Sequence, residues 1–239
     1  MNLLIRGFLD NDSFFGRFMT KLGIIIAANL MFVVFSLPAF TIGAGLAALY
    51  HVMLKTLRSG GVVNPFQQFW NGFKSNFRQG TIAWLIFAGI LGFLSVDLQI
   101  CAQAGGVIAA FRFGIYIIGA IVIFLYLYLL PVMAAFQDTL PHLLRHAVYF
   151  LAKKPWKFGV IAFFDIFPLV LTYTDLKTLP LYAFLWVLFG FGLLAMLGAT
   201  LLLPEFAPFL DEAEEGTAVL DPEDDNTTMI DELEELDGI

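Results

Sequence analysis

The chain has 239 residues, of which 59% are hydrophobic and only 14% are charged, whereas an ordinary soluble domain has about 25% charged residues. A soluble protein could not cover this much apolar surface with so few charged residues. The composition therefore excludes a soluble globular domain, a nucleic-acid-binding protein and a disordered chain. It predicts an all-α, polytopic membrane helix bundle. The single cysteine, Cys101, excludes an intramolecular disulfide.

The charge is distributed unevenly and divides the chain into three parts. Residues 1–204 contain all 13 Lys and Arg but only six acids, whereas residues 205–239 contain 14 acids and no base. We therefore expect a cytosolic or interfacial segment over residues 1–20, a multi-pass membrane domain over residues 21–204, and an acidic, disordered cytosolic tail over residues 205–239.

Six apolar runs are candidates for membrane segments, at residues 22–37, 40–54, 81–96, 113–130, 158–174 and 179–203. The second is the least certain, because its 15 residues span only about 22 Å as a helix. We predict six segments with this one short or re-entrant, and the alternative is five. Asn29, in the middle of the first run, is either an interhelical hydrogen-bonding group or a substrate ligand.

Basic and aromatic residues follow the second run. His51, Lys55 and Arg58 form a stripe that either binds anionic lipid head groups or simply flanks a membrane segment. Asn64 and Pro65 predict the start of a helix over residues 64–79. One face of that helix is aromatic and the other polar to basic, which predicts either an interfacial helix or a helix packed on the bundle. Its candidate lipid-facing residues are Phe66, Phe69, Trp70, Phe73, Lys74, Phe77 and Arg78.

A second inner helix is predicted over residues 139–154, where Pro155 stops it. Asp138, His142 and His146 are spaced so that they would share one face of a continuous helix, which makes them weak candidates for a metal site. The alternative is a solvated polar face, because the HExxH motif is absent and Pro141 places the helix start after Asp138.

Asp165 lies near the middle of the fifth run, close to Pro168. An ionised carboxylate in a bilayer is unfavourable by several kcal/mol, so this side chain should face the bundle or a wet cavity. It is either part of a transport site or an acid that packs against a neighbouring helix.

The acidic tail contains one stretch with helical spacing, formed by Met229, Ile230, Leu233 and Leu236. This stripe either folds on a cytosolic partner or belongs to a tail that only repels its neighbours; the chain's own basic inner loops are a third possible target.

The distribution of Lys and Arg predicts the orientation. With six segments and the N-terminus inside, eleven of these residues are cytoplasmic and two, Arg112 and Lys177, are outside. Both termini are therefore predicted to be cytoplasmic. With five segments the N-terminus moves outside, and the bias falls to eight against five.

Three stretches, FFGRFMTKLG, SLPAFTIGAGLAALYHVMLKTLR and PFQQFWNGFKSNFRQGT, resemble the YesL family of bacterial membrane proteins, which carries a domain of unknown function. Tyr128-Leu129-Leu130-Pro131 is similar to a later element of that family, with Leu130 where the family has Phe. The likeness covers roughly residues 10–205. It implies a multi-pass protein of the bacterial cell membrane that is associated with carbohydrate uptake.

No nucleophile elbow, phosphate-binding loop or dinucleotide fingerprint is present, so we expect neither catalytic residues nor a cofactor. The leading interpretation is a non-enzymatic accessory or scaffold protein in the lipid bilayer, linked through the resemblance to sugar-transport components. The alternatives are a small transporter or channel with a polar path near Asn29 and Asp165, and an intramembrane enzyme.

Overall fold

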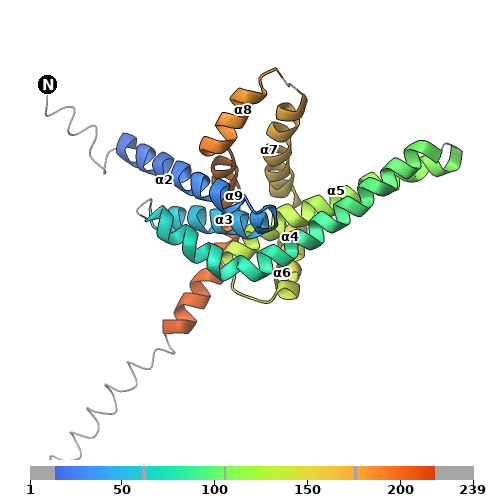
Figure 1. Cartoon of the computed structure of the whole chain (residues 1–239). Coiled ribbons are helices and arrows are strands. Elements are labelled where there is room, and N and C mark those ends of the chain that lie inside the picture. The colour runs from blue at the N-terminus through green and yellow to red at the C-terminus, as the bar shows by residue number, and fades with distance from the viewer. Residues whose placement is uncertain (1–13, 61–62, 105, 175–176, 219–239) are drawn as a thin grey trace, which may run out of the picture. The chain divides into compact units, whose positions relative to one another are not determined.

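The structure is a computed structural model that describes residues 14–60, 63–104, 106–174 and 177–218. Every regular element in these residues is helical, which confirms the all-α prediction (Figure 1). The elements are α2 (Phe14–Phe35), η1 (Ala39–Thr41), α3 (Ile42–Arg58), α4 (Pro65–Ala104), α5 (Gly106–Ala135), α6 (Leu140–Lys153), α7 (Pro155–Thr174), α8 (Leu179–Leu185), η2 (Trp186–Gly190) and α9 (Phe191–Ala218).

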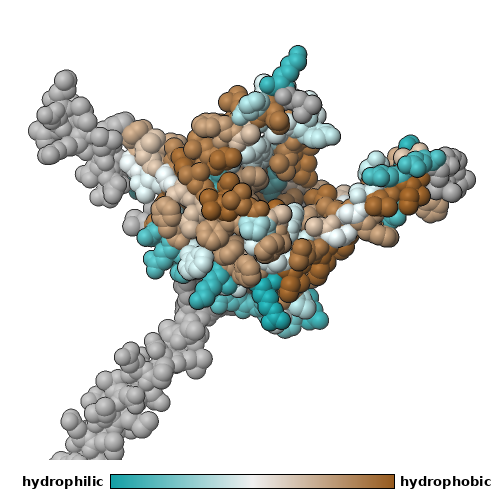
Figure 2. Space-filling view, in the orientation of Figure 1, coloured by the Kyte–Doolittle hydropathy of each residue, from teal (hydrophilic) through white to brown (hydrophobic). Residues whose placement is uncertain are grey.

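The prediction of six membrane segments is confirmed. Among the described residues, six helical stretches are long and apolar enough to cross a membrane: Phe15–Phe35, Ala39–Arg58, Pro65–Gln103, Ala110–Ala135, Pro155–Thr174 and Leu179–Leu210. Their outward surfaces carry many large apolar side chains, which suits contact with lipid tails. Figure 2 shows these hydrophobic residues over the pair α4 and α5 and over α7 and α8.

The uncertain second segment is a helix and forms the centre of the bundle. α3 is preceded by the short 3₁₀ turn η1, and together they give the 20 residues from Ala39 to Arg58. The side chains of Ala44, Ala47, Ala48, Leu49 and Met53 have no exposed surface. The high proportion of small residues reflects burial between neighbouring helices, because small side chains allow two backbones to approach closely.

The closest approach is between α3 and α4. A Cβ atom on Gly80 would lie 2.7 Å from Cα of Ala44, and one on Gly43 would collide with the carbonyl oxygen of Gly80. A Cβ on Gly72 would lie 2.9 Å from Cβ of His51. The small residues of α3 therefore allow a close helix crossing, with glycines of α4 as the facing surface.

α4 begins where the sequence predicts, because the side-chain oxygen of Asn64 accepts hydrogen bonds from the backbone N–H groups of Phe66 and Gln67, at 3.1 and 3.3 Å. It then continues unbroken for 40 residues, about 60 Å. The predicted interfacial helix 64–79 is thus not a separate element but the first part of a helix that includes the third membrane segment. No glycine or proline in this stretch is placed so as to end the helix before residue 81.

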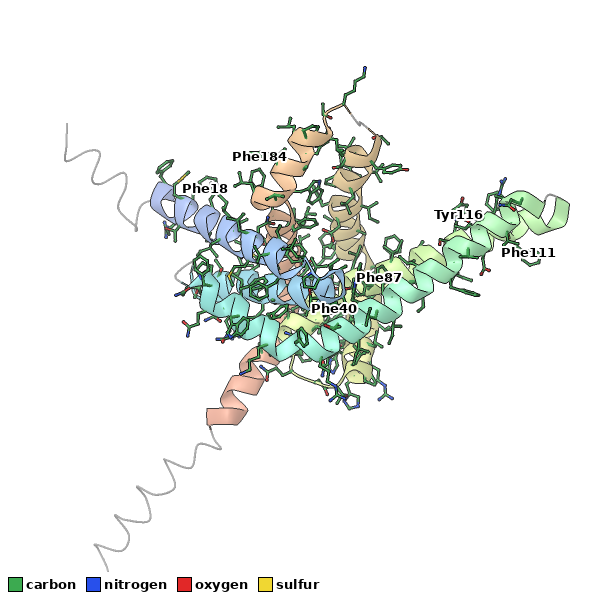
Figure 3. All side chains as sticks on the ribbon, viewed as in Figure 1. Phe18, Phe40, Phe87, Phe111, Tyr116 and Phe184 are labelled. Carbon is green, nitrogen blue, oxygen red and sulfur yellow. The ribbon has the colours of Figure 1, made fainter. Side chains whose placement is uncertain are left out.

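α4 and α5 form a long antiparallel pair, which extends away from α2 and α3 in Figure 1. Where the pair meets the bundle, Phe87 stacks on Tyr126 with ring centroids 4.1 Å apart. Farther out, Phe111 and Tyr116 are exposed near the end of the pair (Figure 3). We infer that lipid surrounds the apolar parts of the pair, residues 81–96 and 113–130, whereas Arg112 belongs to the predicted outer loop.

The chain divides into two units, residues 1–203 and 204–239. Residues 205–218 belong to α9, so this part of the predicted disordered tail is helical. Pro204 and Pro208 lie inside that helix and do not end it. The stripe of Met229, Ile230, Leu233 and Leu236 lies outside the described residues.

Candidate functional site

Asn29 holds an irregular turn of the last membrane segment. Its side-chain N–H₂ donates to the carbonyl oxygens of Trp186 and Val187, at 3.0 and 2.7 Å, and its oxygen accepts from the backbone N–H of Gly192, at 2.8 Å. These groups lie in and just after η2, a π-helical turn in which the regular helical hydrogen-bond pattern is interrupted. Asn29 is fully buried. Of the two roles that the sequence allows for Asn29, an interhelical hydrogen-bonding group and a substrate ligand, the structure supports the first.

A cavity of about 430 Å³ lies beside this turn. Its walls come from the end of α2 and from α3, α5, α7, η2 and α9. Most of the lining side chains are aliphatic or aromatic, and Asn29 is not among them. In the part of the chain that the structure describes, this cavity therefore does not form the expected polar path between Asn29 and Asp165. The amide of Asn29 is engaged by η2, and the space beside Asp165 is largely apolar.

Three polar side chains interrupt these apolar walls: Ser36, Tyr50 and Asp165. Asp165 is 8% exposed and Tyr50 is 4% exposed, so both polar side chains are buried in the protein beside the cavity. The hydroxyl of Tyr50 fits against α9 only because residue 198 is glycine, where a Cβ would lie 2.8 Å from that oxygen. The hydroxyl of Ser36 is buried and has no hydrogen-bond partner in the described part of the chain.

The aromatic wall of the cavity is held in a fixed arrangement. Phe191 packs against Phe32 and Trp186, with ring centroids 5.0 and 4.7 Å apart. The indole N–H of Trp186 donates to the hydroxyl of Thr172 at 2.9 Å, and that hydroxyl donates to the carbonyl oxygen of Pro168 at 2.8 Å. The polar atom of Trp186 is thus used inside the protein, and its ring is available as an apolar surface.

The cluster of Asp138, His142 and His146 lies outside the cavity, at the start of α6. His142 Nδ1 is 3.1 Å from Oδ1 of Asp138, and His146 Nε2 is 3.8 Å from Oδ2. The backbone N–H of Thr139 donates to Oδ1 and holds the pKa of Asp138 below its usual value, and the two histidines lower this pKa further. The three side chains do come together. However, no group of three His, Cys, Asp or Glu side chains that could hold a metal ion is found among the described residues.

The candidate lipid-facing set falls into two groups. Phe66, Trp70 and Phe77 are exposed, as are Lys55, Lys74 and Arg78, whereas Arg58 is half-buried.

The prediction does not hold for Phe69 and Phe73, which are buried, and His51 is half-buried like Arg58. Phe69 and Phe73 are buried because Phe35 of α2 packs on both, with ring centroids 5.7 and 5.0 Å apart. His51 packs on Gly72, and its Nδ1 lies 3.2 Å from the carbonyl oxygen of Ala134. The periodic pattern marks an apolar face but does not say which part of it another helix covers.

Sequence reasoning found Asp165 but missed the residues around it. Ser36, Tyr50 and Trp186 come from three separate parts of the chain, and their spacing carries no motif for a shared site. The one feature of the sequence that could have indicated the site is Tyr50, a polar aromatic residue within a helix otherwise rich in alanine and leucine. The π-helical turn had no signal, because residues 179–203 read as one uninterrupted apolar run.

These features define a helical multi-pass membrane protein with a half-open, largely apolar cavity between its helices. Residues 25–98 match a family model described as "Protein of unknown function, DUF624". The matched segment includes the second half of α2, all of α3 and most of α4, and so contains the close-packed glycines of α3 and α4 and part of the cavity wall. No curated protein and no solved structure matches the chain.

Proposed function

We propose that this chain is a non-enzymatic membrane protein that binds a small, largely apolar molecule in the cavity beside Asp165. The observation that carries the proposal is the cavity itself. Its volume of about 430 Å³ lies within the range of roughly 300–1,000 Å³ that small-molecule sites occupy. Apolar walls with a few polar groups are also typical of such sites.

The cavity is supported on several sides by contacts that do not depend on a ligand. Asn29 holds η2 against α2, and the hydrogen bonds from Trp186 to Thr172 and from Thr172 to Pro168 connect η2 with α7. A wall fixed in this way loses little conformational freedom when a molecule binds, which favours affinity. A small transporter would use the same binding step and would also have to release the molecule on the other side.

The accessory role in carbohydrate uptake is a second proposal, and it rests on the resemblance to the YesL family. The cavity is poorly suited to hold a sugar, because most hydroxyl groups of a sugar would face aliphatic or aromatic side chains without a hydrogen-bond partner. An accessory role would therefore act through contacts with sugar-transport components. In native pull-downs such components should then be recovered equally with or without an open cavity.

Filling the cavity should block binding. Trp186 is the one tryptophan among the lining residues, so a Trp70→Phe/Trp84→Phe/Trp156→Phe protein reports on the cavity through its fluorescence. We expect bromobenzene, a small apolar quencher, to quench Trp186 in a saturable manner. Val33→Phe should abolish the saturable part, because residue 33 lines the cavity and the added ring occupies the space.

The neighbouring residue supplies the matched control. Val34 is 59% exposed and does not line the cavity, so Val34→Phe introduces the same ring on the outside of α2 and should leave the saturable quenching unchanged. Linear quenching that is equal in both variants would mean that bromobenzene reaches Trp186 through the lipid, and the proposal would be wrong.

The membrane orientation is also a proposal, namely that both termini and the loops 58–79 and 132–157 are cytoplasmic in a bacterial cell membrane. Eleven of the 13 Lys and Arg residues then remain on the side where they need not be translocated. Topology reporters fused after residues 20, 75, 150 and 239 should all report the cytoplasm. An external signal from the fusion at residue 20 alone would contradict the six-segment orientation.

A further inference from the structure

The cavity has one feature that a site for purely apolar molecules does not need, the carboxyl group of Asp165. Asp165 is only 8% exposed, and it lies in the wall of the cavity. No Lys, Arg or His is found among the described residues that line this space. An acidic group in apolar surroundings is stabilised by an opposite charge, and the surrounding wall does not supply one.

The aromatic side chains point to the same kind of ligand. Phe32, Tyr50, Trp186 and Phe191 all line the cavity. The face of an aromatic ring attracts a cation that lies within about 6 Å of its centre, and the attraction grows when the cation is removed from water. Because the N–H of Trp186 is held by Thr172, its indole ring takes part through its surface and not as a hydrogen-bond donor.

Other ligand classes fit the cavity less well. An anion would be repelled by the carboxylate and would meet no cationic side chain in the wall. A divalent metal ion such as Ca²⁺ takes six or more oxygen ligands, and the side chains of the wall offer only those of Ser36, Tyr50 and Asp165. A neutral hydrocarbon would fill the space but leave the carboxyl group and the unpartnered hydroxyl of Ser36 without polar contacts.

We propose that the cavity binds an organic cation, an ammonium group on an apolar body, with the ammonium at Asp165 and the apolar body against the aromatic wall. This inference rests on the proposed binding function and adds the chemical class of the ligand. It requires no covalent step, since the contact is an ion pair supported by ring faces. The hydroxyl oxygens of Ser36 and Tyr50 would be further acceptors for an ammonium that carries N–H groups.

The test uses two compounds of nearly identical shape, benzyltrimethylammonium and neopentylbenzene, in which a nitrogen cation is replaced by a neutral carbon. Each compound is titrated into the protein whose single tryptophan is Trp186, in the presence of bromobenzene. A compound that displaces bromobenzene restores the fluorescence of Trp186, and the affinity of the compound is obtained from this recovery. We expect Asp165→Asn to weaken benzyltrimethylammonium about tenfold, since this change removes the charge but keeps the shape of the side chain. The affinity of neopentylbenzene should change less than twofold.

Asp97 supplies the matched control. It lies in α4 and does not line the cavity, so Asp97→Asn makes the same chemical change elsewhere in the chain and should leave both affinities unchanged. If Asp165→Asn changes both compounds by the same factor, or neither, the carboxyl group does not select a cation. The further inference is then wrong while the binding function stands. If bromobenzene shows no saturable quenching in the first place, both proposals are wrong.

Discussion

Replacing Asn29 with leucine should destabilise the protein by about 3 kcal/mol, the cost of leaving several buried backbone groups without hydrogen bonds. The side chain satisfies the carbonyls of Trp186 and Val187 and the N–H of Gly192 at the point where η2 interrupts the helical pattern. In the interior of a membrane protein, no water replaces these partners. Leucine has the same branching and the same number of side-chain heavy atoms as asparagine, so the change removes the hydrogen-bonding groups while it keeps a similar branched shape.

The measurement is the midpoint of SDS-induced unfolding of the purified protein. Thr20 on the same helix supplies the control, because its hydroxyl donates only to the carbonyl oxygen of Gly16 within α2, at 2.9 Å. Thr20→Val should therefore change the midpoint little. Equal midpoints for the Asn29→Leu protein and the unaltered protein would show that η2 keeps its shape without Asn29.

The second large effect is expected at the crossing of α3 and α4. In Gly80→Ala, the new Cβ would lie 2.7 Å from Cα and 2.8 Å from the backbone nitrogen of Ala44. Both atoms belong to the backbone, so no side-chain rotation relieves the overlap and the two helices must separate. Overpacking of this kind costs about 3 kcal/mol, and the better helix propensity of alanine offsets about 1 kcal/mol, which leaves a net loss of about 2 kcal/mol.

Gly89 on the same helix allows a strict comparison, because a Cβ at that position would meet nothing within 4 Å. Gly89→Ala should therefore keep or slightly raise the thermal stability of the detergent-solubilised protein, while Gly80→Ala should lower it. If the two variants unfold at the same temperature, the close contact between α3 and α4 does not contribute to stability.

The position of Asp165 shows how much of the candidate site can be predicted from the sequence. A carboxyl group in the middle of an apolar run must face the protein interior, so its burial could be predicted from the cost of exposing it to lipid. The companions of Asp165 could not be predicted. Ser36, Tyr50 and Trp186 line the same cavity as Asp165 because the turn after α2, α3, α7 and η2 pack around one space. Such packing depends on shape, which hydrophobicity does not encode.

The same distinction separates the two aromatic groups of α4. The spacing of Phe66, Phe69, Trp70, Phe73 and Phe77 predicts a helix with one aromatic face, and the helix is present. Whether a ring on that face contacts lipid or protein depends on where α2 crosses it. Phe35 packs on Phe69, Trp70 and Phe73. Phe69 and Phe73 are buried, Trp70 is still 50% exposed, and Phe66 and Phe77 are exposed.

By itself, the sequence determined the membrane environment, the helical class, the six segments and the capped start of α4. All of these follow from local composition, from hydrophobic periodicity and from the hydrogen-bonding needs of a helix end. Only the tertiary structure decided that 64–79 is continuous with the third segment, that residues 205–218 are helical, that Asn29 holds a π-helical turn and that Asp165 faces an apolar cavity. The last two of these features depend on which surfaces meet. In a membrane, lipid tails are as apolar as the interior of the protein, so hydrophobicity does not determine which surfaces pair, and the close fit of glycines and a few hydrogen bonds does.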